Sequence, residues 1–173
     1  MTIWTGQKLV DTLGVSPEMV TRWRRTGVLR VAAEVGTAKL YEAEDVARLV
    51  SAHANPVETS GVPAAWVVRL SDPAVDDGRK IGWREREPET HLDAATKLWR
   101  IANPEQQAGR ALVVLVGNLA VRVWNITGGT IDPETGKAIF FVEEPTNEQR
   151  AAYADRWLDL GRGTGLQRWP VKD

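Results

Sequence analysis

The chain contains no cysteine, and its only histidines are His53 and His91. Without cysteine it can form no disulfide, no zinc–thiolate site and no cysteine nucleophile. Long apolar runs are also missing, so nothing approaches the length of a membrane-spanning helix, and the opening residues lack the layout of a signal peptide. We therefore expect no contact with a membrane and take the cytoplasm as the default location.

A strong net charge is missing as well. The 22 basic and 23 acidic residues leave a formal charge of −1, so the protein as a whole does not attract a polyanion. The composition, 43% hydrophobic and 26% charged, is typical of a globular protein. A length of 173 residues fits one domain of ordinary size or two small ones.

The chain does have a local basic cluster. Between residues 19 and 40 a single acid, Glu34, occurs with five basic residues: Arg22, Arg24, Arg25, Arg30 and Lys39. The residues before this cluster favour a helix start, because Ser16 suits the N-cap and Pro17 the first helical position. Gly27 suits the left-handed position after the last turn. We predict a short helix over residues 17–26 with arginines on its outer side.

The neighbouring residues predict a small three-helix unit. Thr5 is a candidate cap for a first helix, and a tight turn at 13–15 leads into the basic helix. Residues 30–41 form a two-stranded excursion with its tip near Gly36, and a third helix begins after it with acidic residues. Apolar positions at helical and strand spacing predict one core, made by Leu9, Leu13, Val20, Trp23, Leu29, Leu40, Val46 and Val50.

The order of these signals resembles the winged helix-turn-helix of the MerR superfamily, especially its excisionase-like and BldC-like members. The resemblance covers about residues 4–51, and an acidic start to the following helix belongs to it. Its motifs are G-V-S-P at 14–17, V-T-R-W at 20–23, G-V-L at 27–29 and K-L-Y at 39–41. It implies that the second helix enters a DNA major groove and that the wing touches the adjacent backbone or minor groove.

The resemblance also assigns site residues position by position. The groove-facing side of the helix carries Ser16, Glu18, Thr21, Arg22 and Arg25. Lys39 falls where family members keep a wing arginine, and Tyr41 where they keep a tyrosine. We assign Arg24, Arg30 and Lys39 to phosphate or wing contacts. An ordinary solvated face is the alternative for these charges, and DNA contact is preferred because cap, turn and wing signals occur together.

The rest of the chain has a different character. Residues 1–53 form the predicted DNA-binding domain, 54–63 a linker containing two prolines, and 64–173 a second domain. In the second domain we predict strands at 65–70, 81–87, 110–116, 119–126 and 138–144. Helices are expected at 90–103 and 146–161, the second with Thr146 and Gln149 as a capping box. Residues 161–173 are predicted as an irregular tail. The whole is an α+β protein whose second domain has a mostly antiparallel sheet and two helices.

Several acidic side chains and one histidine are candidates for catalysis, and some of them also have a simpler structural explanation. An acidic stretch could bind magnesium as in metal-dependent nucleases, and it holds Asp72, Asp76, Asp77, Glu85 and Glu87. Turn composition explains Asp76 and Asp77 as well, and His91 has no partner in sequence that would make it a general base. We therefore predict no catalytic residue, no metal and no cofactor, and do not expect an enzyme.

We predict a sequence-specific binder of double-stranded DNA, in the first place a transcriptional regulator. The second domain is expected to bind a small-molecule effector or a protein partner, or to oligomerise. The usual MerR dimerisation helix is missing after residue 54, so the oligomeric state is open, with a homodimer among the options. The alternatives are an excisionase-like or replication and partition accessory factor of a mobile element, and a DNA-targeted metal-dependent nuclease.

Overall fold

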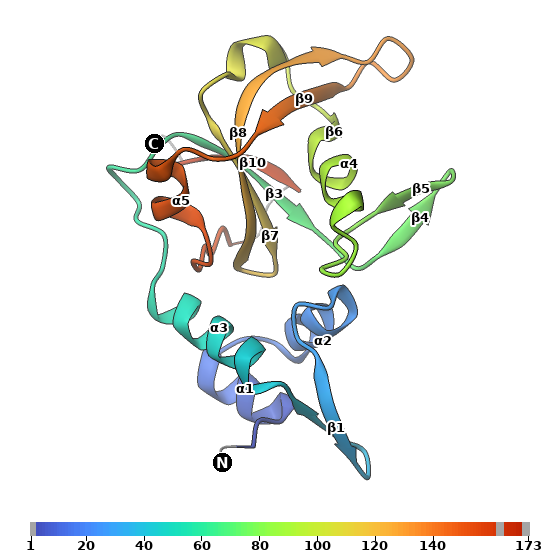
Figure 1. The fold of residues 1–173 in the computed structure, drawn as a ribbon, viewed down its shortest axis with the longest axis vertical. Helices are drawn as coiled ribbons and strands as arrows, with labels where there is room; N and C mark the ends of the chain where they lie inside the picture. Colours follow the sequence, from blue (N-terminus) through green and yellow to red (C-terminus); the bar gives the residue numbers. More distant parts are fainter. Residues whose placement is uncertain (1–2, 162–164, 171–173) are drawn as a thin grey trace.

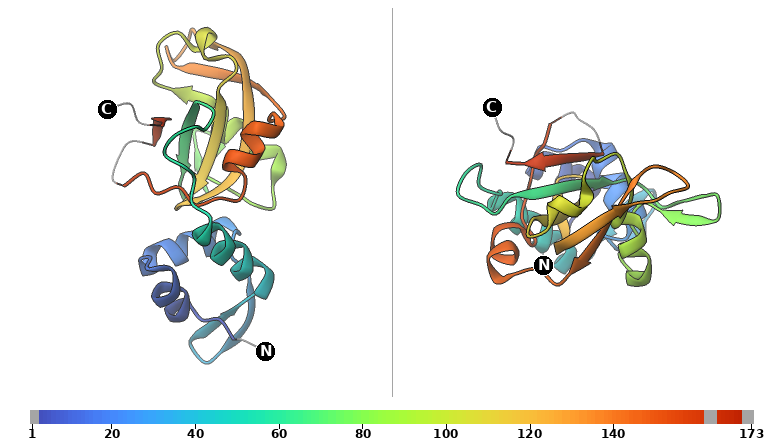
Figure 2. Two further views of the ribbon diagram at one scale, coloured as in Figure 1. Left: turned by 90° about the vertical axis from the view of Figure 1, so that its left-hand side faces the viewer. Right: turned by 90° about the horizontal axis from the view of Figure 1, so that it is seen from above.

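The computed structural model of the protein describes residues 3–161 and 165–170. Within these residues it has an α+β fold with five α-helices (Figure 1). Figure 2 shows two parts stacked end to end: a mainly helical N-terminal part, residues 3–54, and a sheet-rich C-terminal part that begins at residue 64. None of the helices in the described residues has the length and apolar character that crossing a bilayer requires.

The N-terminal part contains α1 (Gly6–Leu13), α2 (Pro17–Thr26), β1 (Val31–Val35), β2 (Ala38–Tyr41) and α3 (Ala43–Ala54). The predicted helix caps are confirmed. The Thr5 side chain accepts a hydrogen bond from the Lys8 N–H, the Ser16 hydroxyl accepts one from the Met19 N–H, and Gly27 is left-handed. Strands β1 and β2 pair as an antiparallel hairpin, and every residue of β1 is exposed. Local signals therefore suffice to define these elements.

The predicted N-terminal core is largely confirmed. The positions that are buried, as expected, are Leu9, Leu13, Val20, Trp23, Leu29 and Val46. The other two, Leu40 and Val50, are only partly buried and pack at the edge of the same cluster.

The C-terminal part is built on a mixed six-stranded sheet with the order β10-β3-β7-β8-β9-β6. Its strands are β3 (Ala65–Leu70), β6 (Lys97–Trp99), β7 (Ala111–Val116), β8 (Leu119–Ile131), β9 (Ala138–Glu143) and β10 (Leu166–Trp169). β3 and β7 run parallel, and the other pairings are antiparallel. Every residue of β7 is buried, because a central strand has both faces covered.

Shorter elements surround this sheet. Strands β4 (Ala74–Asp76) and β5 (Arg79–Ile81) form a separate hairpin. The helical elements are η1 (Pro88–Thr90), α4 (His91–Thr96), η2 (Pro104–Gln107) and α5 (Asn147–Tyr153). The predicted capping box of Thr146 and Gln149 is present at the start of α5.

Two predicted helices are shorter than expected. The predicted helix 90–103 is wrong after Thr96, because residues 97–99 pair with β9 as a sheet edge. The predicted helix 146–161 is wrong after Tyr153. There the Asp155 N–H donates to the Ala120 carbonyl and the Leu158 N–H to the Asn118 carbonyl. In both places pairing with a distant strand outweighs local helical propensity.

Other predicted elements also need correction. The predicted strand 81–87 is wrong, because β5 ends at Ile81 and the Trp83 N–H turns back to the Ser71 carbonyl. Part of the predicted irregular tail is strand β10, which pairs with β3. The remaining tail positions, 162–164 and 171–173, lie outside the described residues.

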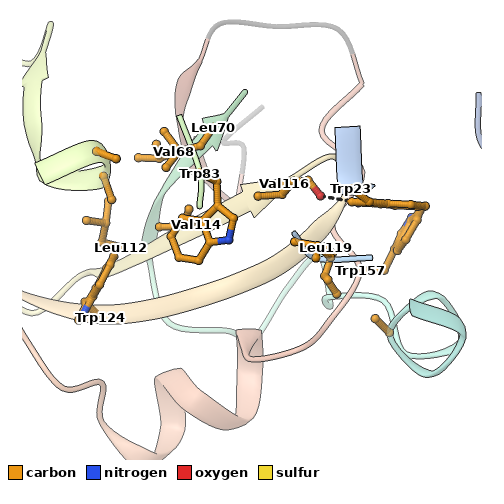
Figure 3. Packing of buried hydrophobic residues seen from close by; sticks show 14 of the residues in the cluster. Trp23, Val68, Leu70, Trp83, Leu112, Val114, Val116, Leu119, Trp124 and Trp157 are labelled. Atoms are coloured by element: carbon orange, nitrogen blue, oxygen red, sulfur yellow. Dashed lines mark hydrogen bonds between the residues drawn. The ribbon is translucent and has the colours of Figure 1, made fainter. Parts of the chain in front are cut away.

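The two parts share one hydrophobic core. The Trp23 side chain of α2 is fully buried, and its Nε1–H donates to the Val116 carbonyl of β7 at 2.9 Å (Figure 3). Its ring also meets Trp157 edge-on, with centroids 5.9 Å apart. Within the predicted linker, Val57 is buried and its N–H donates to the Trp157 carbonyl at 2.7 Å. Helix α2 is therefore packed against the sheet as well as against α1 and α3.

Candidate nucleic-acid interface

Helix α2 carries the predicted groove-facing residues on one exposed side. Glu18, Arg22 and Arg25 are exposed and Thr21 is half-buried, and their spacing along the helix places them on the same face. With Pro17 and Asp72 they line a shallow hollow of about 360 Å³. Ser16 lies at the end of this face, where its hydroxyl caps the helix. The structure thus brings the five predicted residues of this helix together.

The acid on this face is held in its charged form. A hydrogen bond from its own backbone N–H, together with one from Ser16, lowers the pKa of Glu18. The ionised Glu18 carboxylate accepts hydrogen bonds, whereas the guanidinium groups of Arg22 and Arg25 on the same face only donate them. In a major groove such an acceptor fits the amino group of cytosine, and the guanidinium groups fit guanine.

Both arginines of this face contact one carboxylate of the C-terminal part. Arg25 Nη1 lies 2.8 Å from Asp72 Oδ2, and Arg22 Nε lies 3.9 Å from Asp72 Oδ1. The side chains stay accessible, with 58% of Arg25 and 46% of Arg22 exposed. The Asp72 Oδ1 atom is buried and accepts no hydrogen bond from any residue the structure describes. Ion pairs between solvent-exposed groups contribute about 0–1 kcal/mol, and the two arginines of this pair remain accessible to an incoming anion although Asp72 is half-buried.

Arg30 precedes the β1–β2 hairpin and is bound to the start of α3. Its backbone N–H and its Nε both donate to Asp45 Oδ2 at 2.8 Å, and its Nη2 also contacts Glu44. Burial acts to raise the pKa of Asp45, but the hydrogen bonds from Arg30 outweigh it and lower that pKa. In this structure Arg30 therefore fixes the hairpin to α3, and little of its bonding capacity points outward.

The predicted residues of the hairpin itself behave differently from one another. Lys39 forms an ion pair with Glu34, its partner across the two strands, and this hydrogen bond lowers the pKa of Glu34. Tyr41 is half-buried and packs against the hydrophobic core, and its N–H donates to the Trp4 carbonyl. Lys39 is thus placed on the surface of the hairpin, whereas Tyr41 anchors the hairpin to the chain before α1.

A second hollow lies at the end of α2 and was not foreseen from the sequence. It has a volume of about 440 Å³ and separates α2 and the start of β1 from residues 84–87 of the C-terminal part. We call it the arginine cleft, because its charged lining is Arg24, Arg25, Arg30, Arg84 and Arg86 with Glu85 and Glu87. The dense charges at 84–87 were the only sequence signal, and nothing local places them beside α2. At this contact the Glu85 N–H donates to the Thr26 carbonyl at 2.9 Å.

Three of the five acids considered for a metal-dependent nuclease are bound to cations, while Asp76 and Asp77 are exposed at the turn of the β4–β5 hairpin. Asp72 contacts the α2 arginines, Glu85 contacts Arg48, and Glu87 contacts Lys80. In the described ranges no three histidine or acidic side chains gather as a metal-binding cluster.

Each of the two histidines packs against a tryptophan. The His91 ring stacks on Trp83 with centroids 3.7 Å apart, and its Nε2 lies 2.7 Å from the Arg84 carbonyl oxygen. The His53 ring meets Trp157 edge-on.

The protein is therefore an α+β protein in which six arginines line the two hollows at helix α2. Comparisons with known protein families, with curated proteins and with solved structures found no match for this chain. Its function has to be inferred from the arrangement of its own residues.

Proposed function

We propose that this is a sequence-specific DNA-binding protein, in the first place a transcriptional regulator, whose N-terminal part acts as a winged helix-turn-helix. Helix α2 enters the major groove, and the β1–β2 hairpin serves as the wing on the adjacent backbone or minor groove. One observation carries the proposal. A short capped helix holds Arg22 and Arg25 on its exposed side, while Trp23 between them fixes its buried side to the protein core.

The outer side of α2 supplies base contacts. Arg22 and Arg25 can each donate two hydrogen bonds to guanine, and Thr21 and Glu18 extend the reading to neighbouring bases. A good bidentate arginine–guanine contact contributes about 1–3 kcal/mol of discrimination against the wrong base. Binding requires these arginines to exchange Asp72 for the DNA, which their exposure makes inexpensive.

Phosphate contacts would come from the ends of this surface. Arg24 is half-buried at the last turn of α2, and Lys39 lies on the exposed hairpin. Basic side chains at such positions fix the register of the protein on the duplex without reading sequence. The exposed strand β1, residues 31–35, is the part of the hairpin that can lie along the backbone.

The C-terminal part supports α2 from behind and offers surface for an effector or a protein partner. Its contact with α2 through Trp23 and Trp157 means that a change in this part can shift the position of the reading helix. Two sites coupled through one packed element are the physical requirement for regulation by a ligand.

The test is duplex binding measured by fluorescence anisotropy across a salt series, with random and genomic-fragment DNA. For Arg22→Ala we expect loss of preference among fragments. For Lys39→Ala we expect an even loss of affinity on all fragments and a smaller salt dependence. Arg100→Ala serves as the control, since Arg100 is exposed and lies outside both hollows. Wild-type protein that shows no salt-dependent binding would overturn the proposal.

A further inference from the structure

The arginine cleft adjoins the base-reading face proposed above, shares Arg25 with it, and is lined mainly by positively charged side chains. Five arginines line it against two glutamates. The two glutamates are paired, Glu85 with Arg48 and Glu87 with Lys80 and Arg84, and two of the arginines are paired with acids outside the lining, Arg25 with Asp72 and Arg30 with Asp45 and Glu44. The positive charge left over is therefore that of Arg24 and Arg86, which form no ion pair within the described residues. The hydrogen bond from Lys80 also lowers the pKa of Glu87. The cleft is therefore suited to an anion.

Two arginines of the cleft are available for such an anion. Arg24 and Arg86 form no ion pair with any residue in the described ranges, and Arg86 is exposed. Arg25, 58% exposed, is held only by Asp72. Guanidinium groups are the side chains that best match the geometry of phosphate oxygens, because their N–H groups form a planar fork.

The end of α2 would normally repel an anion, since a helix C-terminus presents free carbonyl oxygens. Here three of the last four carbonyl oxygens of α2 accept hydrogen bonds. The Trp23 carbonyl accepts from the Leu29 N–H, the Arg24 carbonyl from the Gly27 N–H, and the Thr26 carbonyl from the Glu85 N–H. These hydrogen bonds inside the protein reduce the partial negative charge at this end of α2. The positive charges of Arg24 and Arg25 offset it further.

On the side of the C-terminal part, backbone carbonyl groups hold the Arg84 side chain in place. Arg84 donates to the Ile81 carbonyl at 2.9 Å and to the Ala74 carbonyl at 2.8 Å, which fixes residue 84 against the β4–β5 hairpin. The hydrogen bond from the Glu85 N–H to the Thr26 carbonyl joins this side of the cleft to the end of α2. Pre-positioned cationic groups lose little entropy when an anion binds.

The cleft is continuous with the reading face of α2. Arg25 lines both the cleft and the hollow that contains Glu18, Thr21 and Arg22. A DNA strand that lies along the outer side of α2 therefore also passes the arginine cleft. This continuity favours a phosphate of the bound duplex over an unrelated anion.

We propose that the arginine cleft binds a DNA backbone phosphate beside the segment read by α2, so that Arg86 of the C-terminal part contacts DNA directly. The inference rests on the proposed function and extends it. The C-terminal part then does more than support or regulate the reading helix: it supplies part of the DNA-binding surface and fixes how far the footprint extends beyond α2.

The experiment compares Arg86→Glu with Arg100→Glu in the full-length protein. Both replace an exposed arginine by an acid, so they change the net charge equally, and Arg100 follows β6 outside the cleft. Circular dichroism and thermal unfolding show that each variant is folded. We expect Arg86→Glu to weaken binding about tenfold or more on every duplex alike and to reduce the slope of log K against log salt by about one. Arg100→Glu should differ from wild type by less than about threefold.

The outcomes separate this inference from the proposed function. If wild type binds DNA and the two variants lose affinity equally, the cleft is not a backbone contact, while DNA binding stands. If wild type shows no salt-dependent binding, both the proposed function and this inference fail.

A free phosphate is the other source of the same chemistry. Thermal unfolding in sodium phosphate and in sodium chloride of equal ionic strength tests it. If phosphate stabilises wild type but not Arg86→Glu, and DNA binding is unaffected by the variant, the cleft holds a free anion and the backbone assignment is overturned.

Discussion

The two sides of helix α2 have opposite physical characters. The inner side carries Val20 and Trp23, which are almost fully buried, and Trp23 also bonds to the C-terminal sheet. The outer side carries Arg22 and Arg25, which stay accessible and are held by a single weak carboxylate contact. The difference shows how a short helix can present charged side chains at a defined place. Its position comes from burial on one side, so its other side can exchange partners freely.

The largest effect is expected from breaking the inner side. Trp23→Ala removes a fully buried ring and its hydrogen bond to the Val116 carbonyl. We expect a loss of about 3–5 kcal/mol in the free energy of unfolding, measured by urea denaturation. Trp23→Phe keeps most of the packing and loses the hydrogen bond, so its cost should be nearer 1 kcal/mol. An unfolding midpoint unchanged by Trp23→Ala would contradict the shared core.

The turn that receives α2 gives a second test of the inner side. Gly117 has a φ of 62°, and a Cβ added there would lie 3.0 Å from both Met19 Cγ and Trp23 Nε1. Gly117→Ala should therefore destabilise the protein by about 2–4 kcal/mol, as backbone strain and overpacking add.

The matched control for this variant is Gly136→Ala. Gly136 has a φ of 66° and no atom within 4 Å of an added Cβ. Gly136→Ala should therefore cost only the backbone strain, about 1 kcal/mol. Equal losses in thermal stability for the two variants would show that α2 does not press on this turn.

The outer side should affect binding and leave stability unchanged. Arg22→Ala and Arg25→Ala are each expected to lose about 1–3 kcal/mol of discrimination between preferred and random duplexes. Their unfolding free energies should stay within about 0.5 kcal/mol of wild type. Anisotropy titrations and denaturant curves on the same preparations give both quantities. If a variant loses stability but keeps its sequence preference, that arginine stabilises the fold and does not contact DNA bases.

The smallest effect concerns the carboxylate that occupies the outer side. Asp72→Asn removes the charge that competes with DNA for Arg22 and Arg25. We expect DNA affinity to rise by about twofold to fivefold at low salt, since accessible ion pairs contribute up to about 1 kcal/mol. Asp76→Asn makes the same change of net charge on the nearby β4–β5 hairpin and should have less effect. A drop in affinity for Asp72→Asn would mean that Asp72 orients the arginines and does not compete for them.

The sequence allowed the N-terminal elements to be predicted with close boundaries because their signals are local. Ser16, Pro17 and Gly27 act within one or two helical turns of their own positions. The Gly117–Asn118 turn between β7 and β8 and the capping box at Thr146 were predictable for the same reason.

Predictions failed where distant segments compete for the same backbone. Residues 97–99 follow a helical pattern, yet their N–H and C=O groups pair with β9. Residues 155–158 likewise leave a helical pattern to bond with the turn between β7 and β8. Tertiary pairing of this kind overrides propensities that differ by fractions of a kcal/mol per residue.

That α2 is a short capped helix with arginines opposite Trp23 follows from local sequence, because capping and helical periodicity act within ten residues. The bond of Trp23 to Val116, the position of Asp72 on the outer side, and the shared lining of the cleft by Arg24 and Arg86 come from the tertiary fold. These contacts join residues about 50 to 90 positions apart. They form because burial of apolar surface brings the sheet onto α2, and no local pattern records which surfaces will meet.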